Sequence, residues 1–190
     1  ESYKSALKFK PNEATIHTNL GNVFKNLGDY QSATESYQKA TQLKPDYAEA
    51  HNNLGNMMRE KGDLDGALER YQQAIKCDPQ YAEAYNNQGI VLNAMGNIKS
   101  AITNYEKALK LKPEYPEVYN NQATIMKDLG NFKSALESYK KAVALNPSYA
   151  EAYANMGVCY QDKGIKDEAL KSYNKALKIN PKYAEIHRYI

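Results

Sequence analysis

A proline recurs every 34 residues along this chain of 190 residues, and no other feature restricts the fold as strongly. The prolines are Pro11, Pro45, Pro79, Pro113, Pro147 and Pro181. A fixed period of this length indicates a stacked array of one small structural unit, in which each copy contacts only its neighbours. We therefore interpret residues 1–190 as a single array. Units that begin three residues after each proline give five full repeats, at 14–47, 48–81, 82–115, 116–149 and 150–183.

Each repeat is predicted to form two α-helices. A glycine suited to the left-handed conformation closes the first helix, at Gly28, Gly62, Gly96, Gly130 and Gly164. The residue after it is a good N-cap for the second helix in four repeats, at Asp29, Asp63, Asn97 and Asn131. Ile165 takes that place in the fifth repeat, so we expect its second helix to begin less firmly. The proline then ends the second helix, and the predicted fold is all-α.

Small residues mark where the two helices of a repeat should touch. Position 8 of each repeat, inside the first helix, is Gly21, Gly55, Gly89, Ala123 or Gly157. A glycine inside a helix costs about 1 kcal/mol relative to alanine, so a close approach of the second helix is the expected compensation. The small residues of that second helix are Ala33, Ala67, Ala101, Ala135 and Ala169. A tyrosine four residues later and an alanine three further on continue one buried stripe.

These positions resemble the tetratricopeptide repeat. Position 4 is His17, His51, Tyr85, Tyr119 or Tyr153, and positions 20, 24, 27 and 32 are Ala, Tyr, Ala and Pro in every full repeat. The resemblance covers essentially the whole chain. It implies a right-handed superhelical solenoid of antiparallel helix pairs, with the first helices lining a concave inner surface.

Both ends of the chain resemble incomplete repeats. Residues 1–13 match the second half of a preceding second helix, and residues 184–190 match the start of a further first helix. We expect apolar side chains such as Tyr3, Leu7 and Ile190 to be exposed there, and we interpret the chain as a piece of a longer array. Association end to end through these uncapped repeats is a further expectation.

Charge and cysteine content restrict the partners and the location. The 25 Lys and Arg and 22 Asp and Glu residues give a net charge of +3, which argues against nucleic acid or an anionic membrane as the partner. No apolar run reaches the roughly 18 residues of a membrane span. Cys77 and Cys159 lie far apart along the array, which predicts free thiols and an intracellular, cytoplasmic location.

No catalytic chemistry is predicted from the residues. His17, His51 and His187 occupy the position where other repeats carry tyrosine, and copies in separate repeats cannot converge on one metal or substrate. There is no glycine-rich phosphate loop, and no serine or cysteine has an evident base. We expect no catalytic residue, metal site or cofactor.

Position 6 of the first helix is an asparagine in every full repeat: Asn19, Asn53, Asn87, Asn121 and Asn155. At 100° per residue, position 6 lies about 200° from the core positions 4 and 8 and is expected to face the groove. Asparagine inside a helix costs about 0.6 kcal/mol relative to alanine, and the adjoining positions 5 and 9 vary while position 6 does not. Peptide binding is the favoured interpretation. Inheritance by duplication, or hydrogen bonding between neighbouring first helices, is the alternative.

An amide side chain can accept from an N–H and donate to a C=O of an extended peptide. First helices about 10 Å apart and an extended chain that advances about 3.4 Å per residue give one asparagine for every three peptide residues. Specificity is expected from flanking groove residues. These are Glu49, Glu83, Glu117 and Glu151 at position 2, and Lys25, Arg59 and Lys127 at position 12. The secondary groove residues also include Asn22 and Asn56 at position 9 and Asn52, Asn86 and Asn120 at position 5.

The unbroken asparagine row resembles the repeat domain of O-GlcNAc transferases, where such a row lines the groove that recruits protein substrates. Tyr189, in the incomplete sixth unit, departs from the row. The resemblance implies an alternative function, the substrate-recruiting arm of a glycosyltransferase whose catalytic domain lies outside this sequence. A structural spacer that stacks end to end is a further alternative. The carboxylate clamp of heat-shock co-chaperones is disfavoured, because it needs basic residues where this chain has Glu, Asn or Thr.

Overall fold

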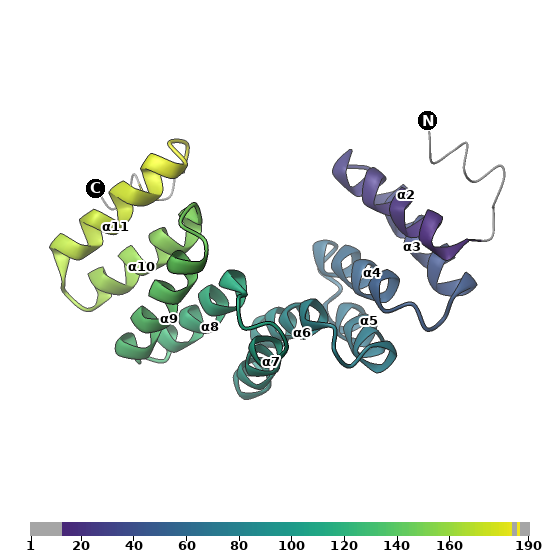
Figure 1. Ribbon diagram of the computed structural model, residues 1–190, viewed down its shortest axis with the longest axis horizontal. Helices are drawn as coiled ribbons and strands as arrows, with labels where there is room; N and C mark the ends of the chain where they lie inside the picture. The colour runs from purple at the N-terminus through teal and green to yellow at the C-terminus, as the bar shows by residue number, and fades with distance from the viewer. Residues whose placement is uncertain (1–12, 184–185, 187–190) are drawn as a thin grey trace. The chain divides into compact units, whose positions relative to one another are not determined.

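The structure, a computed structural model, describes residues 13–183 and residue 186, and the chain divides into two compact units at residues 1–111 and 112–190. Over the described residues the chain forms ten α-helices and no strands (Figure 1). The first unit holds α2 (Ala14–Asn26), α3 (Tyr30–Leu43), α4 (Ala48–Glu60), α5 (Leu64–Cys77), α6 (Ala82–Ala94) and α7 (Ile98–Leu111). The second holds α8 (Pro116–Asp128), α9 (Phe132–Leu145), α10 (Ala150–Asp162) and α11 (Lys166–Ile179).

Helices pack in adjacent pairs within each unit, so the predicted all-α fold of paired helices is confirmed. In the first unit the pairs are α2 with α3, α4 with α5 and α6 with α7, and α3 and α5 each contact the first helix of the next pair. In the second unit α8 pairs with α9 and α10 with α11, while α9 contacts α10. First helices also touch one another, α4 against α6 and α8 against α10. Those contacts bring equivalent residues of neighbouring repeats together.

The predicted glycines do close the first helices. Gly28 has φ of 78°, and its N–H donates to the Lys25 carbonyl at 3.0 Å, while the Asp29 N–H donates to the Phe24 carbonyl at 2.9 Å. This double hydrogen bond needs a left-handed residue at the glycine. The equivalent glycines of the other four repeats have φ between 75° and 82°.

Side-chain caps begin most of the second helices. The Asp29 carboxylate accepts the Ser32 N–H at 3.0 Å, and the Asp63 carboxylate accepts the Gly66 N–H at 2.9 Å. Ile165 supplies no such bond at the start of α11, as expected, yet α11 has 14 residues like the other second helices. Packing against α10 therefore maintains this helix without a cap.

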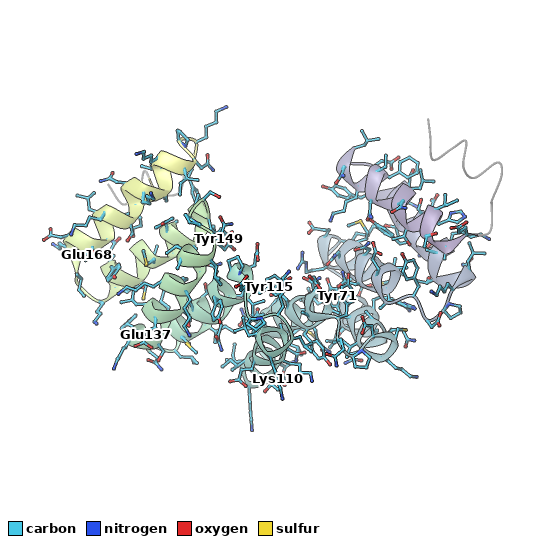
Figure 2. All side chains as sticks on the ribbon, in the orientation of Figure 1. Tyr71, Lys110, Tyr115, Glu137, Tyr149 and Glu168 are labelled. Carbon is cyan, nitrogen blue, oxygen red and sulfur yellow. The ribbon has the colours of Figure 1, made fainter. Side chains whose placement is uncertain are left out.

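The second helix approaches the mid-helix glycines closely, as predicted, but it does so through its tyrosine. A Cβ added at Gly21 would lie 2.5 Å from the ring of Tyr37, and one at Gly157 would lie 2.5 Å from the ring of Tyr173. The tyrosine ring, not the small alanine of the second helix, makes the close approach, because the ring lies across the first helix at that turn. These tyrosines form the core of each repeat, at Tyr37, Tyr71, Tyr105, Tyr139 and Tyr173, all at most 2% exposed. Figure 2 shows the contrast between Tyr71, among the helices, and Lys110 and Glu137, which are exposed.

The predicted half-helix over residues 1–13 and the predicted further helix over 184–190 fall outside the described residues, apart from Glu13 and Ile186. The same holds for His187 and for the apolar end residues named above, so end-to-end association stays a prediction.

Candidate functional site

The position-6 asparagines, called the asparagine row from here on, each stand on the first helix of a pair. Asn19 on α2 is exposed, and Asn53, Asn87, Asn121 and Asn155 are half-buried. In the first unit the row is linked from repeat to repeat. The Asn53 Nδ2 donates to the Asn22 Oδ1 at 3.2 Å, and the Asn87 Nδ2 donates to the Asn52 Oδ1 at 2.9 Å.

The second unit repeats this contact. The Asn155 Nδ2 donates to the Asn120 Oδ1 at 3.0 Å. Hydrogen bonding between neighbouring first helices, the alternative interpretation of the row, is therefore present. It uses one N–H of each primary amide, and an amide has two N–H donors and a carbonyl acceptor. At Asn53 and Asn155 the bond fixes the side chain and leaves an N–H and the carbonyl oxygen for a further partner.

Position 5 does not face the groove as expected. Asn52, Asn86 and Asn120 are 4%, 5% and 1% exposed. Within each unit, position 5 points toward the first helix of the following repeat, where Asn52 accepts from Asn87 and Asn120 accepts from Asn155. Each asparagine at position 5 is thus removed from direct ligand contact. The small size of all five position-5 residues, with Thr18 and Ala154 at the remaining two, is the sequence signal of this restricted space.

Position 9 connects the row to the core. The Tyr37 hydroxyl donates to the Asn22 Oδ1 at 2.7 Å, and the Tyr71 hydroxyl donates to the Asn56 Oδ1 at 2.8 Å. Burial raises the pKa of both phenols to about 12, which keeps them protonated and able to donate. Asn22 and Asn56 were predicted as secondary groove residues, and both remain half-buried beside the row.

The predicted basic residues at position 12 have carboxylate neighbours in two repeats. The Arg59 guanidinium lies 3.5 Å from the Glu60 Oε1. The Lys127 Nζ lies 2.7 Å from the Asp128 Oδ1 and 3.9 Å from the Asp162 Oδ2. Burial opposes the charge on Lys127, but these carboxylates outweigh it and raise the pKa of its ammonium. Lys25 is exposed.

The predicted acidic residues at position 2 differ in exposure. Glu49 and Glu83 are half-buried, whereas Glu117 and Glu151 are exposed. The Tyr47 hydroxyl donates to the Glu49 Oε2 at 3.0 Å, and the Asn120 Nδ2 donates to the Glu151 Oε1 at 3.3 Å. These carboxylates therefore lie at the edge of the surface that carries the row.

A cavity in the second unit gathers several predicted positions. It has a volume of about 270 Å³ and combines the row, position 9 and position 12 with two aromatic residues. Its lining residues are Thr124, Lys127, Ala154, Asn155, Val158, Tyr173, Tyr183 and Ile186. This unit therefore offers a recess beside Asn155 that can admit a side chain.

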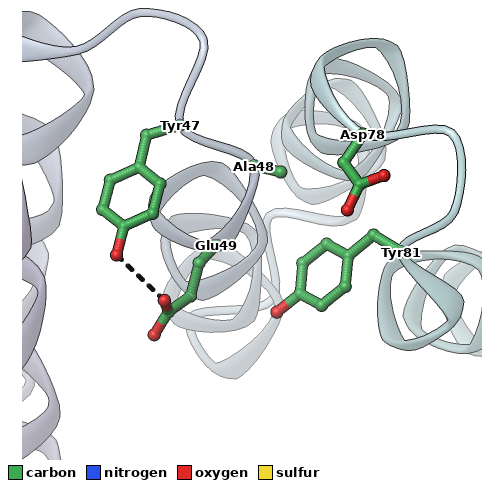
Figure 3. A pocket seen from close by; sticks show the side chains of 5 residues that line it. All are labelled: Tyr47, Ala48, Glu49, Asp78 and Tyr81. Atoms are coloured by element: carbon green, nitrogen blue, oxygen red, sulfur yellow. Dashed lines mark hydrogen bonds between the residues drawn. The ribbon is translucent and has the colours of Figure 1, made fainter.

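A cavity of about 310 Å³ in the first unit was not predicted. Tyr47, Ala48, Glu49, Asp78 and Tyr81 line it (Figure 3). Only Glu49 among them was expected at the site. A tyrosine that recurs as the last residue of every full repeat could have indicated it, at Tyr47, Tyr81, Tyr115, Tyr149 and Tyr183.

His51 is a packing residue, whereas His17 is half-buried. His51 is 5% exposed, its Nε2 lies 2.8 Å from the Pro45 carbonyl, and its Nδ1 is buried without a partner. Burial lowers the pKa of His51, and the positive charge of Arg70 acts in the same direction. Over residues 13–183 and 186, no group of three or more His, Cys, Asp or Glu residues is placed to hold a metal ion, and no helix is long and apolar enough to cross a membrane.

Solved structures similar to this chain are repeat proteins of the same architecture. The crystal structure of MamA is 28% identical, with a TM-score of 0.70 over 87% of this chain and 97% of that one. YrrB, described as a TPR protein with an unusual peptide-binding site, is 22% identical, with a TM-score of 0.69 over 100% of this chain and 97% of that one. One chain of the APC/C hetero-tetramer Cut9–Hcn1 is 19% identical to this chain. Its TM-score is 0.90, over 99% of this chain and 37% of that chain. No curated protein matches the chain.

Sequence models of the repeat cover most of the chain. A model described as "TPR repeat" matches residues 22–58, 55–96 and 123–164, and one described as "Tetratricopeptide repeat" matches residues 82–115 and 150–183. Together with the helix pairs, the closing glycines and the buried tyrosines, these matches show that the chain belongs to the tetratricopeptide repeat family.

Proposed function

We propose that this chain is a protein–protein interaction module that binds extended polypeptide along the first helices, with the asparagine row as the contact to the peptide backbone. The observation that carries the proposal is the contrast between the row and its neighbours. The row is exposed or half-buried, while the asparagines one residue earlier at position 5 are buried. An asparagine repeated at the more exposed position in all five repeats is costly for helix stability unless its amide has a use.

The inter-repeat hydrogen bonds support this use instead of opposing it. A flexible asparagine loses side-chain entropy when a ligand immobilises it, and a side chain that is already fixed avoids much of that cost. Asn53 and Asn155 are fixed by Asn22 and Asn120. Each therefore presents its second N–H and its carbonyl oxygen in one orientation.

The chemistry of the row favours backbone over side-chain recognition. A primary amide matches the N–H and C=O groups of any extended peptide, so the row selects for conformation and the flanks select for sequence. Glu49 and Glu83 in the first unit and the cavity beside Asn155 in the second are the flanking features. The fold is one on which YrrB has a peptide-binding site, which is consistent with this proposal.

The test begins with peptides selected from a random display library against the whole chain. Their affinity is then measured by calorimetry for the wild type and for the double variant Asn19→Ala/Asn53→Ala. Loss of one or two neutral hydrogen bonds, about 0.5–1.5 kcal/mol each, predicts an affinity several-fold to roughly a hundredfold lower. Asn174→Ala, an exposed asparagine on the second helix α11, is the matched control and should bind like the wild type. Unchanged affinity in the double variant would contradict the proposal.

A further inference from the structure

The unpredicted cavity of the first unit combines two tyrosines with two carboxylates. It lies where α5 ends and where α4 and α6 begin. In Figure 3 the Glu49 carboxylate lies between the rings of Tyr47 and Tyr81, and the Asp78 carboxylate is directed toward Tyr81. The cavity therefore presents negative charge next to an aromatic ring.

Other repeats of the same chain show what this ring can bind. Lys44 and Lys112 occupy the position equivalent to Asp78, one repeat before it and one repeat after it. The Lys44 ammonium lies 5.2 Å from the centroid of the Tyr47 ring, and the Lys112 ammonium lies 4.3 Å from the centroid of the Tyr115 ring. In both repeats, a tyrosine equivalent to Tyr81 thus holds a cation supplied by the chain itself.

Asp78 reverses the charge of that position in the second repeat. Instead of an internal ammonium beside the ring, the chain places a carboxylate there, and the Glu49 carboxylate faces the same cavity of about 310 Å³. Asp78 is held in place because its Oδ1 accepts the Gln80 N–H at 2.9 Å, and Glu49 because its Oε2 accepts the Tyr47 hydroxyl at 3.0 Å. Each carboxylate has a second oxygen with which to bind a ligand.

We propose that this cavity binds the cationic side chain of a lysine or arginine in a partner polypeptide. The ring of Tyr81 supplies a cation–π contact, and Asp78 and Glu49 supply charge-assisted hydrogen bonds. This inference rests on the proposed function, because it treats the cavity as a side-chain site beside the peptide backbone. Asn52 connects the cavity to the asparagine row. Its Nδ2 donates to the Tyr81 hydroxyl at 3.4 Å, and its Oδ1 accepts from the Asn87 Nδ2 at 2.9 Å.

The first experiment uses probes that test the cavity without the asparagine row. N-acetyl-arginine amide is titrated into the ¹⁵N-labelled full chain, and N-acetyl-citrulline amide, which has nearly the same shape but no charge, is titrated in parallel. Saturable chemical-shift changes at the amides of residues 47–49 and 78–82 with the arginine probe alone are expected. Equal shifts with both probes, or no shifts at these residues, would overturn the inference.

Two variants sharpen the result. Asp78→Lys recreates the internal lysine of the neighbouring repeats, so it should fill the site and abolish binding of the arginine probe. Asp78→Asn removes one charge-assisted hydrogen bond and should weaken binding about tenfold. Asn146→Lys, at the equivalent position in the second unit, controls for added positive charge and should leave binding unchanged. Full binding by Asp78→Lys would contradict the assignment.

The two proposals can fail separately. If the arginine probe binds but no selected peptide is weakened by Asn19→Ala/Asn53→Ala, the cavity stands and the backbone role of the row fails. If the row variants lose peptide affinity but the probe shows no charge-dependent shift, the row stands and the cationic side-chain site fails.

Discussion

Asn52 and Asn53 are consecutive asparagines on α4, and their surroundings differ sharply. Asn52 is 4% exposed and bonds forward to the next repeat, through Tyr81 and Asn87. Asn53 is half-buried and bonds back to Asn22 of the previous repeat. Residue type therefore does not decide the role of a polar residue in a repeat array. The neighbouring repeat decides it, because it covers one side of each first helix and leaves the adjacent side accessible.

The largest expected effect is on the buried asparagines of position 5, Asn52, Asn86 and Asn120, called the buried row from here on. Asn52→Ala removes the acceptor used by Asn87 and the donor used by Tyr81 in a buried place. Losing these two hydrogen bonds at a buried side chain costs about 1–3 kcal/mol of the free energy of unfolding. Thermal and urea melts should show this loss, while Asn53→Ala should lose much less, because the Asn22 Oδ1 still accepts from Tyr37 at 2.7 Å. Equal losses in the two variants would remove the distinction between the rows.

An intermediate effect is expected at Asn87, which belongs to the asparagine row but supports a buried partner. Asn87→Ala deprives the Asn52 Oδ1 of its donor. It also deprives the Asn86 Nδ2 of an acceptor, although that bond is long, at 3.4 Å. The loss of about 1 kcal/mol for the shorter bond, and of less for the longer one, is partly offset by about 0.6 kcal/mol from the better helix propensity of alanine. The same melts should therefore place Asn87→Ala between Asn52→Ala and Asn53→Ala, and a loss larger than that of Asn52→Ala would reverse the assigned order.

The packing of α4, on which the comparison depends, should respond to pH through His51. Burial lowers the pKa of this imidazole from its ordinary value of 6.5, so the folded chain binds fewer protons than the unfolded one. Its contribution to stability is therefore present above about pH 6.5 and is lost as the pH falls below that value. Between pH 7 and pH 5 the melting temperature of the wild type should fall more than that of His51→Tyr, which carries the residue found at this position in three other repeats. Parallel pH profiles would show that His51 does not titrate in this range.

The smallest effect is expected at the most exposed member of the row. Asn19 is exposed, and among residues 13–183 and 186 its side chain holds no buried group in place by a hydrogen bond. Asn19→Ala should leave the melting temperature unchanged or raise it slightly. The free energy of unfolding should increase by at most about 0.6 kcal/mol, because alanine has the better helix propensity. A clear loss of stability would indicate that Asn19 supports the fold like the buried row.

Much of the fold could be predicted from the sequence because its determinants are local. The glycines that close the first helices and Asp29 and Asp63 at the starts of the second act within a few residues of themselves. The 34-residue period then places the helices in pairs. Even where the cap is missing, at Ile165, the helix follows the period.

The finer features of the site could not be predicted, because they depend on the next repeat. The helical angle separates position 6 from positions 4 and 8, but it does not reveal that α6 covers position 5 of α4 and buries Asn52. The cavity at Tyr81 is hidden for a related reason. Glu49 and Asp78 are 29 positions apart, and only the stacking of α4, α5 and α6 brings them to one place.

The most direct test of the central claim compares the two rows in one spectrum. Side-chain amide resonances of the asparagines are recorded by ¹⁵N NMR before and after saturation with a peptide selected against the chain. We expect the resonances of Asn19 and Asn53 to shift on binding and those of the buried Asn52 and Asn120 to stay nearly unchanged. Shifts at Asn52 and Asn120 with none at Asn19 and Asn53 would contradict the central claim.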